Sequence, residues 1–220
     1  GMAMSLDTYA NLQTAIAGWL DVTAGTLSSQ IADLITVGER RIFREARTRD
    51  METQIVGTMN NGNFPVPTGY VALKYLYLNT SPVQALERRP TEWIYENYPF
   101  QSSSGRPVYF ARDGANFIFG PYPDSSYDIK GMCFSRLVPL ATAVNQLFVN
   151  CPDLYLMAAL AEADLILGRD ARLPIWEAKY QKILIDVNGE YKTEESSGSS
   201  LRTRVATAVT NRRGNYSPLG

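Results

Sequence analysis

The side chains best suited to chemistry in this sequence are two pairs of closely spaced carboxylates, Glu162 with Asp164 and Asp124 with Asp128. Two carboxylates that flank a glycosidic bond can act as general acid and as base or nucleophile in a glycosidase. Glu162 and Asp164, however, lie two residues apart in a predicted helix, and such neighbours do not share a helix face. We therefore expect Glu162 to pair with an arginine of a neighbouring helix, and we predict no catalytic site.

The residues that most often perform catalysis or bind metals are scarce. The sequence contains no histidine, the usual general base near neutral pH and the commonest metal ligand, which excludes Ser-His-Asp and Cys-His catalysis. Cys133 and Cys151 lack the paired spacing of a zinc site or a disulfide scaffold, which fits a reducing compartment. The common nucleotide-binding, metalloprotease and nucleophile-elbow motifs are missing as well. We predict a protein that is not an enzyme and that uses no cofactor and no metal.

The composition is that of an ordinary globular protein. The 220 residues are 45% hydrophobic and 20% charged, and the net charge is -1, which gives the molecule as a whole no bias toward nucleic acid. The most apolar segment, 150–168, is too short to cross a membrane and is interrupted by Glu162 and Asp164. No signal peptide is predicted at the start of the sequence.

The strongest helix prediction covers Asn150–Gly168. Pro152 suits the first helical position, Asp153 suits the positive end of the helix dipole, and Gly168 suits the left-handed residue just past the helix end. Apolar residues surround nearly the whole segment, which is typical of a central helix. We expect the other helices to pack around it.

Three further helices are predicted at Leu6–Leu20, at Ser28–Arg47 and from Asp170 to Tyr191. In the second of these, Gly38 on the apolar stripe allows a neighbouring helix to approach closely. We predict an outer face for the charged residues at its end, which are Glu39, Arg40, Arg41, Arg44, Glu45, Arg47 and Arg49. This face is either solvated, with pairs such as Arg41–Glu45, or it contacts an acidic partner. In the last helix, the stripe that begins at Trp176 and Tyr180 predicts core packing.

Between the helices, residues 51–136 change to the alternation of β-strands. The strands are expected at Thr53–Thr58, Leu73–Leu78, Val83–Leu86 and Tyr127–Phe134, with Thr91 capping one or two helical turns. Asp113-Gly114 predicts a type I′ hairpin that pairs Phe110 with Phe117 and Val108 with Phe119. The predicted fold class is therefore α+β, a bundle of N- and C-terminal helices with an inserted small antiparallel β-sheet module.

The predicted domains are N-terminal helices of the bundle (5–50), the β module (51–136), C-terminal helices of the bundle (144–191) and a flexible basic tail (192–220). Glu194–Ser200 has the composition of a flexible linker. The tail then carries Arg202, Arg204, Arg212 and Arg213 and no acidic side chain. It is either a frayed terminus or an arm that becomes ordered on a partner.

Aromatic side chains of the β module offer a second function. They are Tyr75, Tyr77, Trp93, Tyr95, Tyr98, Tyr109 and Tyr122. Such residues either fill a sheet core or present a rigid amphipathic surface for binding. The alternative prediction is a carbohydrate- or surface-recognition module that uses these aromatics.

The order of the segments resembles the head-to-tail adaptor, or connector, proteins of tailed bacteriophages and prophages, in particular the podovirus type. The resemblance extends over about Ser5 to Val187, and it is carried by SLDTYANLQTAIAGWL, ERRIFREARTRDMET, FPVPTGYVALKYLYLN, GRPVYFARDGANFIFGPYPDSSYDIKGMCF, NCPDLYLMAALAEADLILGRD and WEAKYQKIL. None of these motifs is catalytic.

The resemblance implies structural work in the virion. Such adaptors form a ring under the portal of the capsid, usually twelvefold, extend the DNA channel and provide a platform for the tail. The implied partners are the portal protein, tail proteins and other copies of the chain, with genomic DNA only passing through and no membrane contact. The protein would be made in the bacterial host cytoplasm. On this view the tail arginines Arg202, Arg204, Arg212 and Arg213 bind the portal, and Arg40, Arg44 and Arg47 form a subunit interface with acidic residues of a neighbour.

Overall fold

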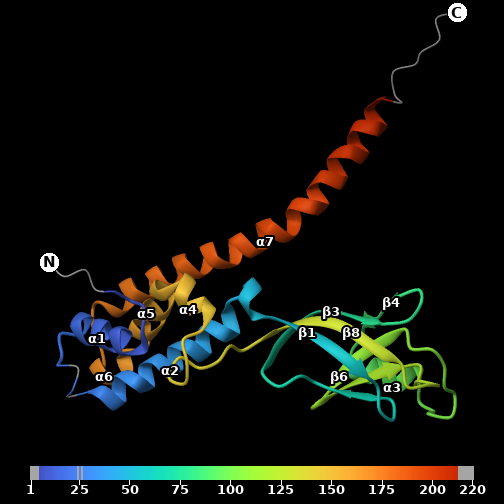
Figure 1. The fold of residues 1–220 in the computed structure, drawn as a ribbon, viewed down its shortest axis with the longest axis horizontal. Coiled ribbons are helices and arrows are strands. Elements are labelled where there is room, and N and C mark those ends of the chain that lie inside the picture. Colours follow the sequence, from blue (N-terminus) through green and yellow to red (C-terminus); the bar gives the residue numbers. More distant parts are fainter. Residues whose placement is uncertain (1–4, 24, 26, 213–220) are drawn as a thin grey trace, which may run out of the picture. The chain divides into compact units, whose positions relative to one another are not determined.

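The computed structural model describes residues 5–23, 25 and 27–212, with side chains described as far as Ser196. The chain divides into two compact units, a helical unit formed by residues 1–49 and 139–220 and a β unit formed by residues 50–138. Helices from both ends of the sequence build the first unit, and the strands between them build the second (Figure 1). The predicted α+β class, with a small sheet module between N- and C-terminal helices, is confirmed.

The helical unit is organised around α5, as the sequence predicts. Its elements are α1 (Tyr9–Trp19), α2 (Ser28–Glu45), α4 (Gln146–Asn150), α5 (Pro152–Ala161), α6 (Asp164–Leu167) and α7 (Leu173–Arg212), and the 3-10 turn η1 (Arg49–Met51) follows α2. Every residue from Leu154 to Leu160 is buried, and α5 contacts α1, α2, α4 and α7. Because the apolar residues surround the helix, it can serve as a core for neighbours on all sides.

Gly38 sets the distance between α2 and α5. A Cβ atom at this position would lie 2.9 Å from both the carbonyl carbon of Ala158 and the backbone nitrogen of Ala159. No side chain fits in that space, so the predicted close approach at Gly38 is confirmed.

The segment predicted as one helix over 150–168 is broken in two places. Cys151 leaves the helical region with φ −136° and ψ 63°, because a residue before proline is disfavoured there. The helix then restarts with Pro152 in its first turn and ends at Ala161, where Glu162 and Ala163 make tighter bonds to carbonyls three residues back. Gly168 has the predicted positive φ of 65° just past α6.

The helix α7 continues where the sequence predicts a flexible linker. It runs through Glu194–Ser200 and ends at Arg212, and its red C-terminal part extends beyond the other helices of the unit (Figure 1). Extending a helix that is already formed costs far less than nucleating one, and the packed first half of α7 supplies the nucleus. Glu194 and Glu195 also form ion pairs with Arg49, at 3.0 and 3.2 Å.

The β unit contains two four-stranded sheets where the sequence predicts one. Their strand orders are β1-β8-β3-β4 and β2-β7-β6-β5. All strand pairs are antiparallel except β5 with β6. The strands are β1 (Glu52–Thr58), β2 (Asn63–Pro65), β3 (Tyr70–Leu78), β4 (Gln84–Ala85), β5 (Glu87–Arg88), β6 (Tyr109–Asp113), β7 (Asn116–Gly120) and β8 (Asp128–Ser135), and the short helix α3 spans Thr91–Asn97.

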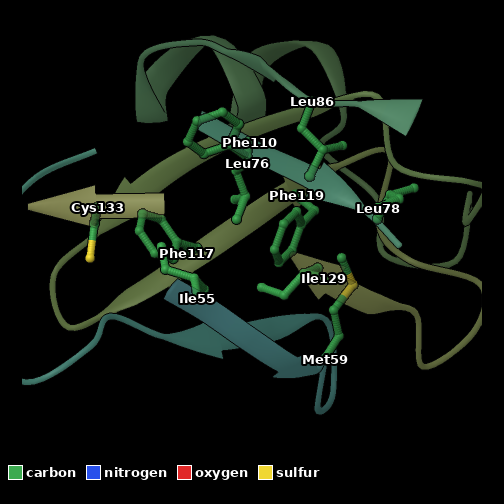
Figure 2. Packing of buried hydrophobic residues seen from close by; sticks show 10 residues of the cluster. All are labelled: Ile55, Met59, Leu76, Leu78, Leu86, Phe110, Phe117, Phe119, Ile129 and Cys133. Atoms are coloured by element: carbon green, nitrogen blue, oxygen red, sulfur yellow. The ribbon is translucent and has the colours of Figure 1, made fainter. Parts of the chain in front are cut away.

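The two sheets share one apolar core. Figure 2 shows the ten side chains of this cluster converging between the strands, and both sheets contribute to it. They are Ile55, Met59, Leu76, Leu78, Leu86, Phe110, Phe117, Phe119, Ile129 and Cys133. A strand alternates its side chains between two faces, so each sheet turns one face toward this core. The other face of the β6–β7 pair is covered by α3, and Ala111 is buried there.

The hairpin β6–β7 forms at the predicted place with a different register. Asp113 pairs with Asn116, and Phe110 pairs with Phe119 rather than with Phe117. The turn residues are therefore Gly114 and Ala115, and only Gly114 has a positive φ, of 61°, which is the type II′ pattern. Each partner is shifted by two residues, an even number, so the phenylalanines still share one face, and this face points into the core.

Thr8 caps α1, because its hydroxyl oxygen accepts a hydrogen bond from the Asn11 amide. The predicted cap of α3 is corrected. Pro90 precedes α3, and the Thr91 hydroxyl donates to the carbonyl of Arg112 instead of capping the helix.

Candidate functional site

The carboxylates considered for catalysis do not converge. Asp124 accepts a hydrogen bond from the hydroxyl of Tyr127, and Asp128 accepts one from the hydroxyl of Thr58, both at 2.6 Å. Glu162 lies 3.8 Å from Arg41, which confirms the predicted pairing with an arginine of a neighbouring helix. Within residues 5–23, 25 and 27–212, no group of three or more metal-binding side chains is close enough to hold an ion. In the same described part of the chain, no helix is both long and apolar enough to span a membrane.

The cysteines lie in separate units. Cys133 is buried in the core of the β unit, where burial raises the pKa of its thiol and so disfavours the reactive thiolate. Cys151 is half-buried at the junction of α4 and α5.

The aromatic residues of the β unit fall into separate groups. Trp93, Tyr98 and Tyr109 contact one another, with ring centroids 4.7 Å apart for Trp93 and Tyr109. Tyr75 and Tyr77 form a second contact at 5.2 Å. The hydroxyl of Tyr95 instead donates to Asp113 at 2.7 Å, and Tyr122 lines a small hollow that is in part bounded by Tyr95 and Tyr98.

Three arginines from two separate segments of the sequence lie close together on the surface of the β unit. Arg88, Arg89 and Arg112 line a hollow of about 400 Å³ together with Pro90 and Thr91. Arg89 stacks over the rings of Trp93 and Tyr109, and Arg112 stacks over Tyr70. The parallel pairing of β5 with β6 brings these residues together, and no local sequence pattern predicts that pairing.

The inner face of α2 carries a half-buried arginine. The guanidinium of Arg41 donates two hydrogen bonds to the carboxylate of Glu177 and one, at 3.2 Å, to Glu45. It also lies 4.3 Å from the centre of the Tyr180 ring, whose hydroxyl donates to Glu45 at 2.8 Å. The predicted pair Arg41–Glu45 is thus confirmed, but it belongs to a contact between α2 and α7 and not to a solvated face.

This cluster perturbs the ionisation of its members. Hydrogen bonds from Arg41 hold the pKa of Glu177 below its usual value, and the bonds to Glu177 raise the pKa of Arg41. Burial is the largest cause of the raised pKa of the Tyr180 phenol. At neutral pH the cluster therefore contains a fully charged arginine and ionised Glu177.

Glu39 is the clearest correction to the predicted outer face. Its side chain is buried with 6% exposure, and one carboxylate oxygen accepts the backbone N–H of Leu140 at 2.9 Å. The hydroxyl of Tyr155 is hydrogen-bonded to Glu39 as well, and the amide of Asn145 donates to that hydroxyl at 2.9 Å. Burial raises the pKa of Glu39 above its ordinary value. Glu39 follows Ile35 by four residues and therefore lies on the same side of the helix as the apolar stripe. This spacing is the sequence signal for its buried position.

The outer face of α2 carries the arginines predicted for a subunit interface. Arg40 and Arg44 are exposed one helical turn apart, and their guanidinium groups make no ion pair or hydrogen bond with the described residues. Arg47 lies two residues past the end of α2. Its guanidinium donates to the carbonyls of Ala46 and Arg44 at 2.7 and 3.0 Å, and its backbone N–H donates to Asn188 of α7 at 2.8 Å. Arg47 thus stabilises the C-terminus of α2, where a positive charge is favoured.

The arginines predicted to bind the portal fall at the end of the chain. Arg202, Arg204 and Arg212 are backbone positions within α7, and Arg213 lies outside the described residues.

Comparison with protein families places the chain in one of them. The sequence model of the SU10 adaptor protein family matches residues 7–206. The chain therefore belongs to the SU10 adaptor protein family and is a structural phage head–tail adaptor. No curated protein matches the chain.

Proposed function

We propose that this adaptor is of the podovirus type, forms a ring under the phage portal and docks on the portal through the C-terminal part of α7. The observation that carries this proposal is the extension of α7 to Arg212, beyond the other helices of its unit (Figure 1). A helix that projects from a bundle can reach a second protein while its base stays packed. In α7 that base is secured by Trp176 and Tyr180, which are both buried.

The positive charge at the end of α7 suits an acidic surface on the portal. Arg202, Arg204 and Arg212 occur in this part of α7, with Arg213 directly after it, and no acidic residue occurs from Leu201 to Gly220. Charges of one sign on a projecting segment accelerate and orient association with an oppositely charged partner. This electrostatic attraction also makes portal binding sensitive to salt, because dissolved ions screen exposed charges.

Ring formation needs two different surfaces on each copy, one of which meets the other on the next copy. Arg40 and Arg44 supply one such surface, since both are exposed on α2. Arg47 contributes at the edge of this surface while it also caps α2. In the proposed assembly, twelve copies surround the DNA channel, genomic DNA passes through it, and tail proteins attach on the side away from the portal.

The experiment is negative-stain microscopy of the chain mixed with the portal protein encoded beside its gene. The proposal predicts a second ring stacked on the portal that is absent when the chain is omitted. Deletion of residues 201–220 should abolish this ring and leave the melting temperature of the chain unchanged. The deletion removes the far end of α7 and leaves the buried base of the helix in place.

Two results would count against the proposal. Undecorated portals with free wild-type chain would remove the ring and docking roles. A normal second ring formed by the truncated chain would leave the ring and remove the role of the C-terminal part of α7.

A further inference from the structure

We propose that the outer face of α2 in one copy docks in parallel on the outer face of α7 in the next copy, with Arg40 and Arg44 opposite Asp186 and Glu190. This inference rests on the proposed ring and names the two surfaces that would build it. Both surfaces belong to the helical unit.

The outer face of α2 is a narrow stripe with an ordered sequence of charges. From the N-terminus it presents Asp33, Val37, Arg40 and Arg44, at steps of four, three and four residues, and all four are exposed. At about 100° per residue these steps keep the side chains on one side of the helix. The stripe thus reads acidic, apolar and then basic, and Val37 is 38% exposed.

The outer face of α7 carries the opposite order. Lys182, Asp186 and Glu190 lie in one row at steps of four residues, Ile185 lies at the edge of this row beside Lys182, and all four are exposed, Ile185 by 67%. The carboxylates of Asp186 and Glu190 make no ion pair or hydrogen bond with the described residues. From the N-terminus this stripe is basic and then acidic, with an apolar residue at its edge, so its charges complement those of the stripe on α2.

The two stripes match in spacing only when the helices run in the same direction. With a rise of about 1.5 Å per residue, placing Val37 opposite Ile185 brings Asp33 level with Lys182 to within about 2 Å. In the same alignment Arg40 and Arg44 each fall within about 3 Å of the level of Glu190, a difference that a long arginine side chain easily covers. An antiparallel alignment about the same centre would place Arg40 opposite Lys182 and Asp33 opposite Glu190, which repel.

The inner sides of the same two helices are already used within the chain. Arg41 of α2 binds Glu177 of α7, and Asn188 of α7 binds the end of α2 at Glu45 and Arg47. The outer stripes are therefore different surfaces of one bundle. A contact between two different surfaces is heterologous, and it leaves one of each kind available at every step, as a ring requires.

The magnitudes indicate what these charges contribute. An exposed ion pair adds little to affinity, because water and salt screen it, so the rows mainly fix direction and partner, with Val37 and Ile185 as the apolar contact. Reversing one row, in contrast, places like charges opposite each other at every contact in the ring, which disfavours assembly strongly.

A charge-reversal experiment tests the pairing. Arg40→Glu with Arg44→Glu makes both faces acidic along these rows, and Asp186→Lys with Glu190→Lys makes both basic. When either double variant is mixed alone with the portal, the number of portal particles that carry a second ring should fall at least tenfold. An equimolar mixture of the two should restore the ring. If the two variants alternate around the ring, every contact joins an acidic row to a basic row. Arg169→Glu, an exposed arginine of the same unit outside both rows, should decorate the portal like wild type.

The outcomes separate this pairing from the proposed function. If the wild-type chain forms the ring and either double variant also decorates the portal normally, the pairing is overturned and the proposed ring stands. A mixture that stays undecorated, while both variants melt like wild type, also overturns it. Failure of the wild-type chain to form a ring removes the proposed function, and the pairing with it.

Discussion

Both faces of α2 carry charged residues, but the environments of those charges are opposite. On the inner face, Glu39 is buried and Arg41 is half-buried, and each is satisfied by groups from other segments of the helical unit. On the outer face, Arg40 and Arg44 are exposed and make no ion pair or hydrogen bond with the described residues. Neighbouring residues of one charged run therefore serve the fold on one side and are available for assembly on the other.

This difference shows that a run of charged residues on a helix does not by itself reveal which of them are exposed. Their angular positions around the helix axis are needed as well. Arg40 and Arg41 are about 100° apart around the axis, and this rotation separates solvent from the contact with α7. A buried charge is retained only where partners compensate for its lost hydration, as Glu177 and Glu45 do for Arg41. The outer arginines have no such constraint from the fold, so they can change without loss of stability.

The largest effect on stability is expected from Arg41→Met. This change leaves the carboxylates of Glu177 and Glu45 without their cation inside a packed contact. Removing one partner of a buried pair costs roughly 3–5 kcal/mol, and we expect about 2–3 kcal/mol here because solvent reaches part of the cluster. Glu177 itself is 41% exposed. Urea unfolding measures the loss.

Arg40→Met is the matched control for that change. It removes the same charge one residue away on the outer face, and we expect a change within about 0.5 kcal/mol. Equal losses in the two variants would contradict the distinction between the faces.

Gly38→Ala should be the next most destabilising change. The added methyl group would meet backbone atoms of Ala158 and Ala159 at 2.9 Å, so α2 and α5 must move apart. Overpacking of this kind costs about 1–3 kcal/mol. Gly18→Ala in α1 is the control, since no atom lies within 4 Å of its added Cβ, and it should stabilise by about 0.4–1 kcal/mol. A neutral result for Gly38→Ala would show that the helices have room to adjust.

Glu39→Gln should change how stability depends on pH. Burial raises the pKa of Glu39 in the folded chain, so on raising the pH the unfolded chain loses this proton first. Stability then falls between the unfolded and the folded pKa and stays lowered above the folded value. Glutamine does not titrate, so the stability of the variant relative to wild type should increase with pH. Urea midpoints between pH 4 and pH 8 measure the difference, and a difference that stays constant or decreases with pH would contradict this assignment.

Ion pairing at Glu177 should act in the opposite direction. Its pKa is lowered by Arg41, so its contribution to stability is present above the unfolded pKa and is lost as pH falls through the folded pKa. Glu177→Gln should therefore reduce the loss of stability in acid by a modest amount. Acid titration followed by circular dichroism would detect it, and an unchanged acid midpoint would argue against the lowered pKa.

Much of the fold could be predicted from local pattern. The alternation of β1, β3 and β8 and the all-round apolar surface of α5 specify their elements, because burial on one or all sides leaves a periodic signal. The same alternation predicts one shared face for the paired phenylalanines of the hairpin, and they do share a face. Their register was wrong, because Asp113-Gly114 favours a type I′ turn and the chain adopts a turn at Gly114-Ala115.

Other features depend on contacts between distant segments. The buried position of Glu39 depends on Leu140, which is 101 residues away in sequence, and the arginine hollow of the β unit depends on a parallel strand pair. The continuation of α7 through Glu194 is supported by its ion pair with Arg49. Composition alone marked that stretch as a linker, since serine and glycine are typical of flexible segments.

The most direct test of the separation between the faces of α2 pairs two readouts on one variant, Arg40→Glu with Arg44→Glu. Thermal melting reports on the fold, and negative-stain microscopy with the portal reports on assembly. We expect an unchanged melting temperature and no second ring on the portal. A lowered melting temperature would show that the outer arginines serve the fold, and a normal second ring would show that they do not serve assembly; either result would contradict the account.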